Sequence, residues 1–272
     1  MRQPQLAAGI AVSFIITVMS LVSVFWVPYD LNHIDASIRL MPPSAGHPLG
    51  TDNLGRDIFS RVMAGGRYSL LLAVLTVLGA AAVGCLLGLF AGYLGGITDG
   101  IIMRVIDTLS SFPGIVLALL LVSVIDDSQL SLFTALLILF IPSYTRVMRA
   151  GAVQYRNSLF IQAEKITGAG FFRVTFIHIL PNLAPSLVSA SVVGLSNAIL
   201  AESTMSYLGM GIQPPYPSWG RMLFESQAWF FNAPWYALAP GFFIMLTVLA
   251  FHLLGEGLKN IYLNRGYGGL NG

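Results

Sequence analysis

The sequence predicts an all-α polytopic membrane protein with six membrane-spanning helices. Of its 272 residues, 56% are apolar and only 10% are Asp, Glu, Lys or Arg, whereas a soluble domain carries about 25% charged residues. Six stretches of at least 18 residues contain none of these four residue types, and a helix needs roughly 20 residues to cross a bilayer. Helices are expected because every backbone polar group must be satisfied within the segment that crosses lipid.

Charge, cysteine content and motifs exclude several other classes of protein. The net charge is only +2 and the basic residues are scattered, so there is no basic patch for nucleic acid. Cys85 is the only cysteine, which excludes an intrachain disulfide and a metal site built from several cysteines. The sequence also lacks a phosphate loop, a nucleophile elbow and a paired-histidine zinc motif. We therefore expect a protein that is not an enzyme and that holds no cofactor or metal of its own.

The six expected spans differ in how clearly they begin and end. They occupy residues 6–27, 68–98, 108–125, 128–145, 174–201 and 226–255. The third has an alternative start near Ile101, which would include Arg104 and Asp107, and at this spacing we expect those two residues to form an interfacial pair. The first is either a cleaved signal peptide or an uncleaved anchor. Its bulky end at residues 25–28 and its length favour the anchor, since the apolar region of a signal peptide has about 7–15 residues.

The distribution of basic residues predicts that both termini are cytoplasmic. An even number of spans places the two ends on one side of the membrane. With the termini inside, the inner loops and tails hold nine of the fourteen basic residues and the outer loops hold five. This bias agrees with the positive-inside rule.

Two of the loops between the spans are long. The outer loop, residues 28–67, contains four Asp and four Arg and is expected to be rich in turns before a short helix near residues 57–63. The inner loop, residues 146–181, holds five basic residues and one acid, Glu164. The chain is therefore divided into an N-terminal anchor helix with a periplasmic loop (1–67), a transmembrane domain that includes the inner loop (68–257) and a cytoplasmic tail (258–272).

A stripe of small residues marks the second span. Gly84, Gly88 and Gly92 recur every four residues, with Ala80 one turn earlier. Helices in lipid associate through packing contacts rather than through escape from water, and small residues let two backbones approach closely. The stripe predicts a helix packed inside a bundle and carries no information about a substrate.

Polar groups within or beside the spans are candidates for lining a water-filled route. They are Ser110, Ser111, Ser189, Ser196, Asn197 and Glu202. Such groups can meet a passing solute, but a helical hydroxyl also commonly bonds to a carbonyl of its own helix, and both interpretations stay open. No span centre holds a charged residue, whereas proton relays in pumps are built from such groups. The energy for any transport is therefore expected to come from another source.

A short amphipathic helix is predicted within the inner loop, at residues 160–168. Phe160, Ala163 and Ile166 share one face at three-residue spacing, and Gly168 ends the helix. A helix of this kind either lies on lipid headgroups or inserts its apolar face into a groove on a cytoplasmic partner. The pattern alone does not choose between these uses.

The end of the inner loop resembles the "EAA" loop of the inner-membrane permeases of ATP-binding-cassette (ABC) importers. That pattern is Glu-Ala-Ala, a glycine after three more residues, and a closing Ile-x-Leu-Pro. Here residues 162–164 take the lead positions, Gly168 is the glycine, and Leu180 and Pro181 end the motif. The sequence departs from the pattern at Gln162, Glu164 and His178.

Further segments resemble the second permease of the dipeptide, oligopeptide and nickel uptake systems. They are residues 47–61, 103–107 with 112–113, and 202–211 with 219–220. The resemblance extends over residues 28–257. It implies a type I (MetI-like) transmembrane domain in a bacterial inner membrane.

The resemblance also implies partners and a coupling role. A sister permease would complete the pathway as a heterodimer, two cytoplasmic ATPase subunits would bind ATP and Mg²⁺, and an extracytoplasmic solute-binding protein would deliver the cargo. The residues that would couple to the ATPases are Phe160, Gln162, Ala163, Glu164, Ile166 and Gly168. The cargo would be a peptide or a nickel- or metal-chelate-type solute, and a length of 272 residues is nearer to the nickel branch.

Alternatives remain for the whole chain and for one segment. The chain could be a stand-alone ion-coupled carrier or channel, which needs a gradient rather than partner chains, or a membrane scaffold without flux. Residues 50–61 form either a solvated outer helix, in which Asp52, Arg56 and Asp57 pair locally, or a contact with the sister permease or the binding protein. We prefer the solvated helix.

Overall fold

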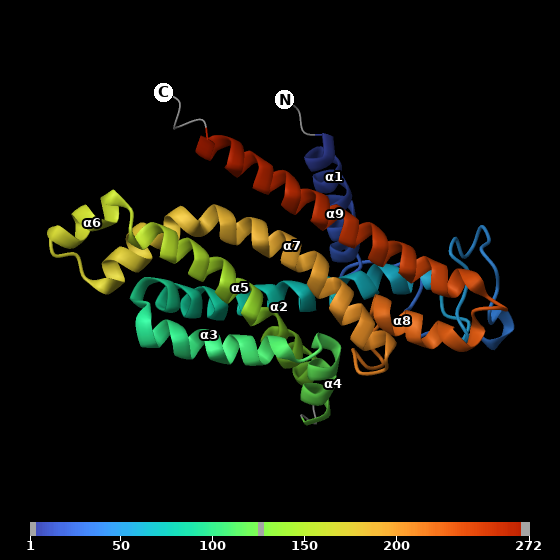
Figure 1. The fold of residues 1–272 in the computed structure, drawn as a ribbon. Helices are drawn as coiled ribbons and strands as arrows, with labels where there is room; N and C mark the ends of the chain where they lie inside the picture. Colours follow the sequence, from blue (N-terminus) through green and yellow to red (C-terminus); the bar gives the residue numbers. More distant parts are fainter. Residues whose placement is uncertain (1–3, 125–127, 268–272) are drawn as a thin grey trace.

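The computed structural model describes residues 4–124 and 128–267, and within them the chain is a bundle of α-helices (Figure 1). Five helices are long and apolar enough to cross a membrane. They are α1 (Pro4–Val22), α2 (Ile58–Leu94), α5 (Ser128–Arg156), α7 (Leu180–Tyr207) and α9 (Pro234–Tyr267). The predicted all-α membrane fold is confirmed. Two predicted limits, Ile125 at the end of the third span and the part of the tail beyond residue 267, lie outside the described residues.

The third predicted span is not one straight helix. Helix α3 (Gly96–Ser111) and helix α4 (Gly114–Val124) meet at an angle of 93°, so six spans are counted only if this bent pair is one broken span. The bend lies at Phe112, whose backbone is extended at φ −80° and ψ 140°. Pro113 explains it, because the ring of a proline disfavours the helical conformation of the residue before it.

Helix α2 is longer than the apolar run that predicted it. It begins at Ile58, where the Asp57 carboxylate accepts a hydrogen bond from the backbone N–H of Ser60 at 2.7 Å and caps the helix. The short outer helix expected at 57–63 is therefore the first two turns of α2, and the helix continues past residue 67. The prediction failed because a run of uncharged residues cannot extend back past Arg67, whereas the helix continues through both Arg67 and the buried Arg61.

Helices α2 and α5 lie side by side along the glycine stripe. A Cβ atom added to Gly88 would lie 2.5 Å from the carbonyl oxygen of Thr145, and one added to Gly92 would lie 2.6 Å from the carbonyl oxygen of Arg149. Gly84 meets α5 one turn earlier in the same way. No side chain fits at these positions, so the stripe lets the two backbones make contact.

The inner loop is mostly helical. Helix α5 continues to Arg156, the short helix α6 (Leu159–Ile166) follows, and a π-helix (Arg173–Ile179) leads directly into α7. The expected helix at 160–168 is thus confirmed, and its C-terminal glycine lies in the turn just after it.

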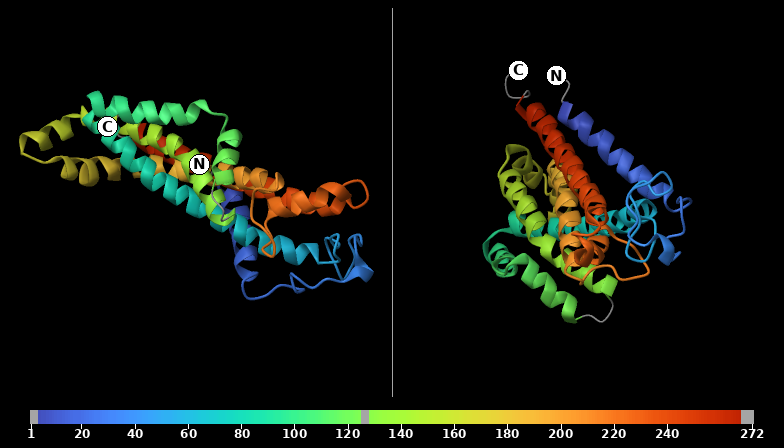
Figure 2. Two further views of the ribbon diagram at one scale, coloured as in Figure 1. Left: turned by 90° about the horizontal axis from the view of Figure 1, so that it is seen from below. Right: turned by 90° about the vertical axis from the view of Figure 1, so that its right-hand side faces the viewer.

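The opposite end of the bundle holds residues 28–57, the segment after α7 and helix α8 (Trp219–Ser226). Helix α8, which the sequence analysis did not anticipate, packs against α7 and α9 and is capped by Ser218, whose hydroxyl accepts the N–H of Arg221 at 3.1 Å. The views in Figures 1 and 2 place α6 at one end of the molecule and these outer segments at the other. Helices α2 and α7 run between these two ends.

Candidate functional site

Helix α6 turns one residue inward and leaves an apolar face exposed. Ile161 is fully buried in a cluster with Leu89 of α2 and Met148 of α5. On the other sides of the helix, Leu159 is 84% and Ile166 is 88% exposed. The exposed residues Leu159, Phe160, Ala163 and Ile166 are called the α6 apolar face below. Among the described residues, the ring of Tyr155 packs edge-on against Phe160, which is 41% exposed, so this face is only partly covered.

A glycine-dependent turn ends α6. Gly168 has φ +83°, its N–H donates to the carbonyl of Lys165 at 3.1 Å, and the N–H of Ala169 donates to the carbonyl of Glu164 at 3.0 Å. This pair of bonds is the Schellman arrangement, which satisfies the last carbonyls of a helix and requires a residue that tolerates the left-handed region. The sequence therefore specifies where α6 stops and how the chain leaves it.

Side-chain contacts hold α6 against the bundle. The carboxylate of Glu164 lies 3.5 Å from Nε2 of His178 in the π-helix, and the ammonium of Lys165 lies over the ring of Tyr93 on α2 at 5.0 Å. Gln162 donates its amide to the carbonyl of Asn157 at 3.0 Å. Glu164 and His178 are two of the three positions that depart from the "EAA" pattern, and the structure brings them together.

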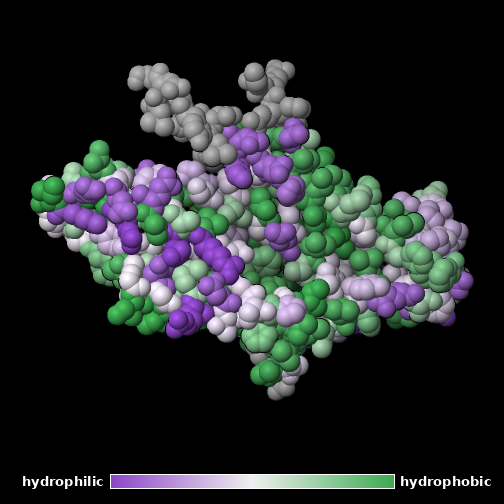
Figure 3. Space-filling model, in the orientation of Figure 1, coloured by the Kyte–Doolittle hydropathy of each residue, from purple (hydrophilic) through white to green (hydrophobic). Residues whose placement is uncertain are grey.

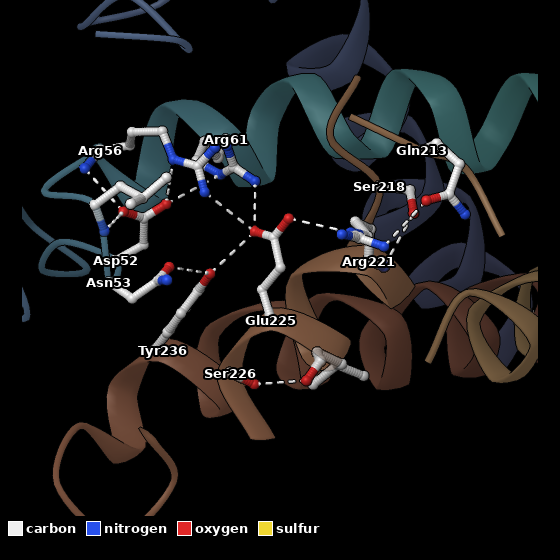
Figure 4. Close-up of polar contacts among 12 residues, drawn as sticks. Asp52, Asn53, Arg56, Arg61, Gln213, Ser218, Arg221, Glu225, Ser226 and Tyr236 are labelled. Carbon is white, nitrogen blue, oxygen red and sulfur yellow. Dashed lines mark hydrogen bonds and ion pairs between the residues drawn. The ribbon is translucent and has the colours of Figure 1, made fainter. Parts of the chain in front are cut away.

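At the outer end, Glu225 of α8 is the centre of a buried polar cluster (Figure 4). Its carboxylate accepts hydrogen bonds from Arg56 at 3.2 Å, Arg61 at 3.0 Å, Arg221 at 3.1 Å and the hydroxyl of Tyr236 at 3.1 Å. Asp52 accepts a further bond from Nε of Arg56 at 2.6 Å. These six residues, Asp52, Arg56, Arg61, Arg221, Glu225 and Tyr236, are called the Glu225 cluster below.

The Glu225 cluster overturns the preferred interpretation of residues 50–61. Asp52 and Arg56 do pair locally, but Asp52 is completely buried and the segment is a turn that leads into α2 rather than a solvated helix. Burial favours the neutral form of Glu225, but the guanidiniums of Arg61 and Arg56 outweigh it and hold the pKa of the Glu225 carboxyl below its ordinary value. The segment is an integral part of the outer end of the bundle.

Glu202, a candidate for the pathway, lies inside a packed junction. Its carboxylate is fully buried and accepts hydrogen bonds from Ser206 at 2.8 Å and Ser203 at 3.3 Å. Gly220 of α8 packs directly against this turn of α7, since a Cβ there would lie 2.6 Å from the carbonyl oxygen of Ser203. In this chain the carboxylate faces neither a groove nor the surface.

The other pathway candidates are dispersed. Ser110 and Ser111 lie on α3 and donate to the carbonyls of Ile106 and Thr108, and Ser110 also accepts a bond from Arg146. The hydroxyl of Ser196 is buried on α7 and has no hydrogen-bond partner among the described residues. Only two of the six candidates, Ser189 and Asn197 of α7, line a cavity in common.

The interfacial pair expected between Arg104 and Asp107 is wrong. Asp107 instead pairs with Arg146 of α5 at 3.0 Å, and Asp99, one turn from the start of α3, pairs with Arg149 of α5. A partner on a neighbouring helix is available because α3 packs back against α5. These ion pairs fix the inner half of the bent pair to the bundle.

The cavity shared by Ser189 and Asn197 is a groove of about 740 Å³ between α5, α7 and α9. Its lining also includes Asn182 and Ser186 of α7 and His252, Glu256 and Lys259 of α9. The three α9 residues were not predicted as pathway residues. The signal that could have identified the α7 side is the set of polar residues at positions 182, 186, 189 and 197. Figure 3 shows hydrophilic surface near the C-terminal half of α9 and at the α6 end, beside a mainly hydrophobic middle.

Comparison with known proteins shows what this sequence is similar to. Residues 84–261 match the family described as "Binding-protein-dependent transport system inner membrane component". The dipeptide transport system permease protein of Haemophilus influenzae is 37% identical over 93% of this chain and 88% of its own length. The dipeptide permease of Alkalihalophilus pseudofirmus is 43% identical (82% and 74%), and the glutathione transport system permease protein of Pectobacterium atrosepticum is 39% identical (93% and 84%).

Proposed function

The chain belongs to the binding-protein-dependent inner-membrane permeases of ABC importers, in the dipeptide and oligopeptide family, and from this we propose how it works. It is one permease subunit and forms half of the translocation pathway beside a sister permease. Two cytoplasmic ATPase subunits dock beneath it and supply the energy by hydrolysing ATP. A solute-binding protein delivers the cargo from the other side.

The α6 apolar face is the observation that supports the ATPase-docking step. Leu159 and Ile166 are almost fully exposed at the tip of the molecule, while Ile161 on the inward side fixes the helix to the bundle. Burial of an exposed Leu or Ile side chain in a partner's groove contributes about 1.5–3 kcal/mol. A short helix held in this way suits insertion into a groove on a cytoplasmic protein.

Movement of α6 has a direct mechanical route to the spans. The Schellman turn at Gly168 leads to the π-helix, and the π-helix continues without a break into α7. Contacts of Glu164 with His178 and of Lys165 with Tyr93 hold α6 to the π-helix and to α2. Displacement of α6 during ATP turnover would therefore rotate or shift α7, which lines the groove.

We place α6 and both termini on the cytoplasmic side of a bacterial inner membrane. Residues 146–181 carry five of the fourteen basic residues and one acidic residue, which favours the cytoplasm. The Glu225 cluster then lies on the outer side. There it supports the surface that the binding protein and the sister permease would meet.

We propose peptides as the class of cargo. The relatives compared are named for the transport of dipeptides and glutathione. The nickel-type solute that chain length suggested remains a prediction from sequence alone. Selection among peptides would belong largely to the binding protein.

Replacement of Gly168 tests the coupling role. Proline cannot adopt φ +83° and has no N–H for the bond to Lys165, so Gly168→Pro should abolish ATP-dependent uptake of labelled dialanine in vesicles that contain the complete transporter. Gly168→Asn is the matched control, because asparagine tolerates the left-handed region, and it should retain most of the uptake. Immunoblotting of the membrane fraction would verify that both variants insert.

Two outcomes would contradict the proposal. Undiminished uptake by Gly168→Pro would remove the coupling role from α6. Accumulation by the purified chain alone, driven by an ion gradient without ATP or partners, would favour the stand-alone carrier. As a second test, Ile166→Asp should reduce co-purification of the ATPase subunits, whereas Ile34→Asp, at an isoleucine that is 60% exposed at the outer end, should not.

A further inference from the structure

The groove between α5, α7 and α9 has a polar lining along helices that span the membrane. Four polar residues of α7 line this groove, namely Asn182, Ser186, Ser189 and Asn197. Asn182, Ser186 and Asn197 are exposed at the surface of this chain. Amide groups left facing hydrocarbon are costly, so this face meets water or another protein rather than lipid.

A second groove on α7 provides the contrast. It has a volume of about 630 Å³, lies between α2 and α7, and is lined almost only by aliphatic side chains such as Val74, Leu78 and Val188. Such a surface suits lipid chains or another apolar partner. Helix α7 therefore separates an apolar side from a polar side, and only the polar side is suited to a hydrated solute.

The polar groove lies in the inner half of the molecule. From Asn182 to Asn197 it follows α7 for fifteen residues, or about 22 Å at 1.5 Å per residue. Beyond Asn197 the helix enters the packed junction that holds Glu202. The groove thus extends toward the α6 end and is closed in this chain toward the Glu225 cluster.

Three ionisable side chains from α9 line the inner part of the groove. His252, Glu256 and Lys259 follow one another at spacings of four and three residues, so they share a face of the helix. The His252 ring lies 3.5 Å from the Glu256 carboxylate, and both side chains are about half exposed. An acid and a base therefore lie one helical turn apart, opposite the amide of Asn182 and the hydroxyl of Ser186.

We infer that this groove is the surface over which cargo moves and that His252, Glu256 and Lys259 form a contact site for zwitterionic solutes. Glu256 would receive an ammonium group and Lys259 a carboxylate. The amide nitrogen of Asn182 already donates to the carbonyl of His178 at 2.7 Å, so its amide oxygen would accept from a peptide-like N–H. The inference rests on the proposed function, since it assigns residues to the pathway of an importer. Cover of the same face by the sister permease is the competing outcome.

Thiol labelling tests both water access and charge selection, and it does not require the cargo to be identified. In a Cys85→Ser background, Ser186→Cys is placed in the polar groove and Val188→Cys in the apolar groove. The complete transporter, in inside-out vesicles, is treated with a membrane-impermeant trimethylammonium methanethiosulfonate or with its anionic sulfonate counterpart. We expect Ser186→Cys to react at least about tenfold faster than Val188→Cys, since hydrocarbon excludes both charged reagents.

Charge selection is measured as the ratio of the cationic to the anionic rate at Ser186→Cys. Glu256→Gln should lower this ratio and Lys259→Gln should raise it, each by about three- to tenfold for one charge at groove distances. Labelling of the isolated chain but not of the complex would overturn the inference, because the sister permease would then cover the groove. Equal ratios in all variants would overturn the contact site.

ATP-dependent uptake of dialanine by the unmodified complex is measured in the same vesicles. Failure of that uptake counts against the proposed peptide importer, whereas the labelling pattern alone decides the role of the groove.

The variant His252→Ala provides a further measurement of the contact site. If the contact site handles the cargo, this change raises the dialanine concentration needed for half-maximal uptake, while ATP hydrolysis stimulated by the binding protein is retained.

Discussion

The inner and outer ends of the bundle both carry charged residues but use them differently. At the outer end, three arginines share Glu225 and Asp52, and these side chains are buried or nearly so. At the inner end, the pairs Glu164–His178 and Arg146–Asp107 are partly exposed, and an apolar face points away from the protein. The outer end buries its charged side chains, although it also exposes Phe231 at 95%, whereas the inner end leaves its ion pairs partly exposed.

This difference indicates which end of the bundle a partner protein can displace more easily. Breaking a buried charge cluster is expensive because each remaining charge stays away from water, while an exposed pair contributes about 0–1 kcal/mol. The outer end therefore behaves as a fixed frame, whereas at the inner end only the buried Ile161 and partly exposed pairs oppose displacement of α6. This distribution of stiffness would suit the proposed displacement of α6 by ATPase subunits.

The largest effect is expected from the loss of Glu225. Glu225→Ala leaves Arg61 buried without its closest carboxylate and should destabilise the protein by about 3–5 kcal/mol. Thermal unfolding in detergent, followed by tryptophan fluorescence, would measure the change. Asp107→Ala is the matched control at the inner end, where the pair with Arg146 is exposed, and its effect should stay within about 1 kcal/mol.

The dependence of the unfolding temperature on acid pH tests the role of Glu225 independently. Because the pKa of Glu225 is lowered in the folded protein, its stabilising contribution is present above the ordinary value of 4.5 and is lost as the pH falls through the lowered value. The unfolding temperature of Glu225→Gln should therefore fall less on acidification than that of the wild type. Equal losses for Glu225→Ala and Asp107→Ala, or parallel acid profiles, would contradict the contrast between the ends.

A smaller effect is expected in the glycine stripe that joins the two ends. Gly88→Ala forces a Cβ to within 2.5 Å of the Thr145 carbonyl, so α2 and α5 must separate, at a cost of about 1–3 kcal/mol. Gly100→Ala on α3 is the control, since its Cβ would have no atom within 4 Å, and alanine should stabilise the helix by up to about 1 kcal/mol. Equal unfolding temperatures for the two variants would show that the close approach is unimportant.

Features that depend on neighbouring residues were predictable from the sequence, and those that join distant residues were not. The apolar runs, the glycine stripe and the helix ended by Gly168 follow from local composition and spacing. The bend at Phe112 was also signalled locally by Pro113, but a count of uncharged residues does not register it. Arg56 and Glu225 are 169 positions apart, and no local pattern pairs them.

The candidate site divides in the same way. The α6 apolar face could be predicted because one short helix contains it. The groove requires three helices to be placed side by side, so the sequence did not identify His252, Glu256 and Lys259 of α9 as pathway residues. Glu202 was ambiguous from sequence because its position near the end of a span does not reveal that α8 packs over it.

The smallest effect concerns Glu164 and His178, two departures from the "EAA" pattern that lie 3.5 Å apart. Glu164→Ala and His178→Ile each restore the residue typical of the pattern and remove one partner of the pair. Because both side chains are partly exposed, we expect a coupling free energy between them of at most about 1 kcal/mol. A double-mutant cycle on the unfolding temperature would measure it. If the pair holds α6 to the π-helix, the single changes should lower uptake per ATP hydrolysed and the double change should restore part of it. Strictly additive effects in both assays would mean that the two residues act independently, and that the contact of Lys165 with Tyr93 and the buried Ile161 alone fix α6 to the bundle.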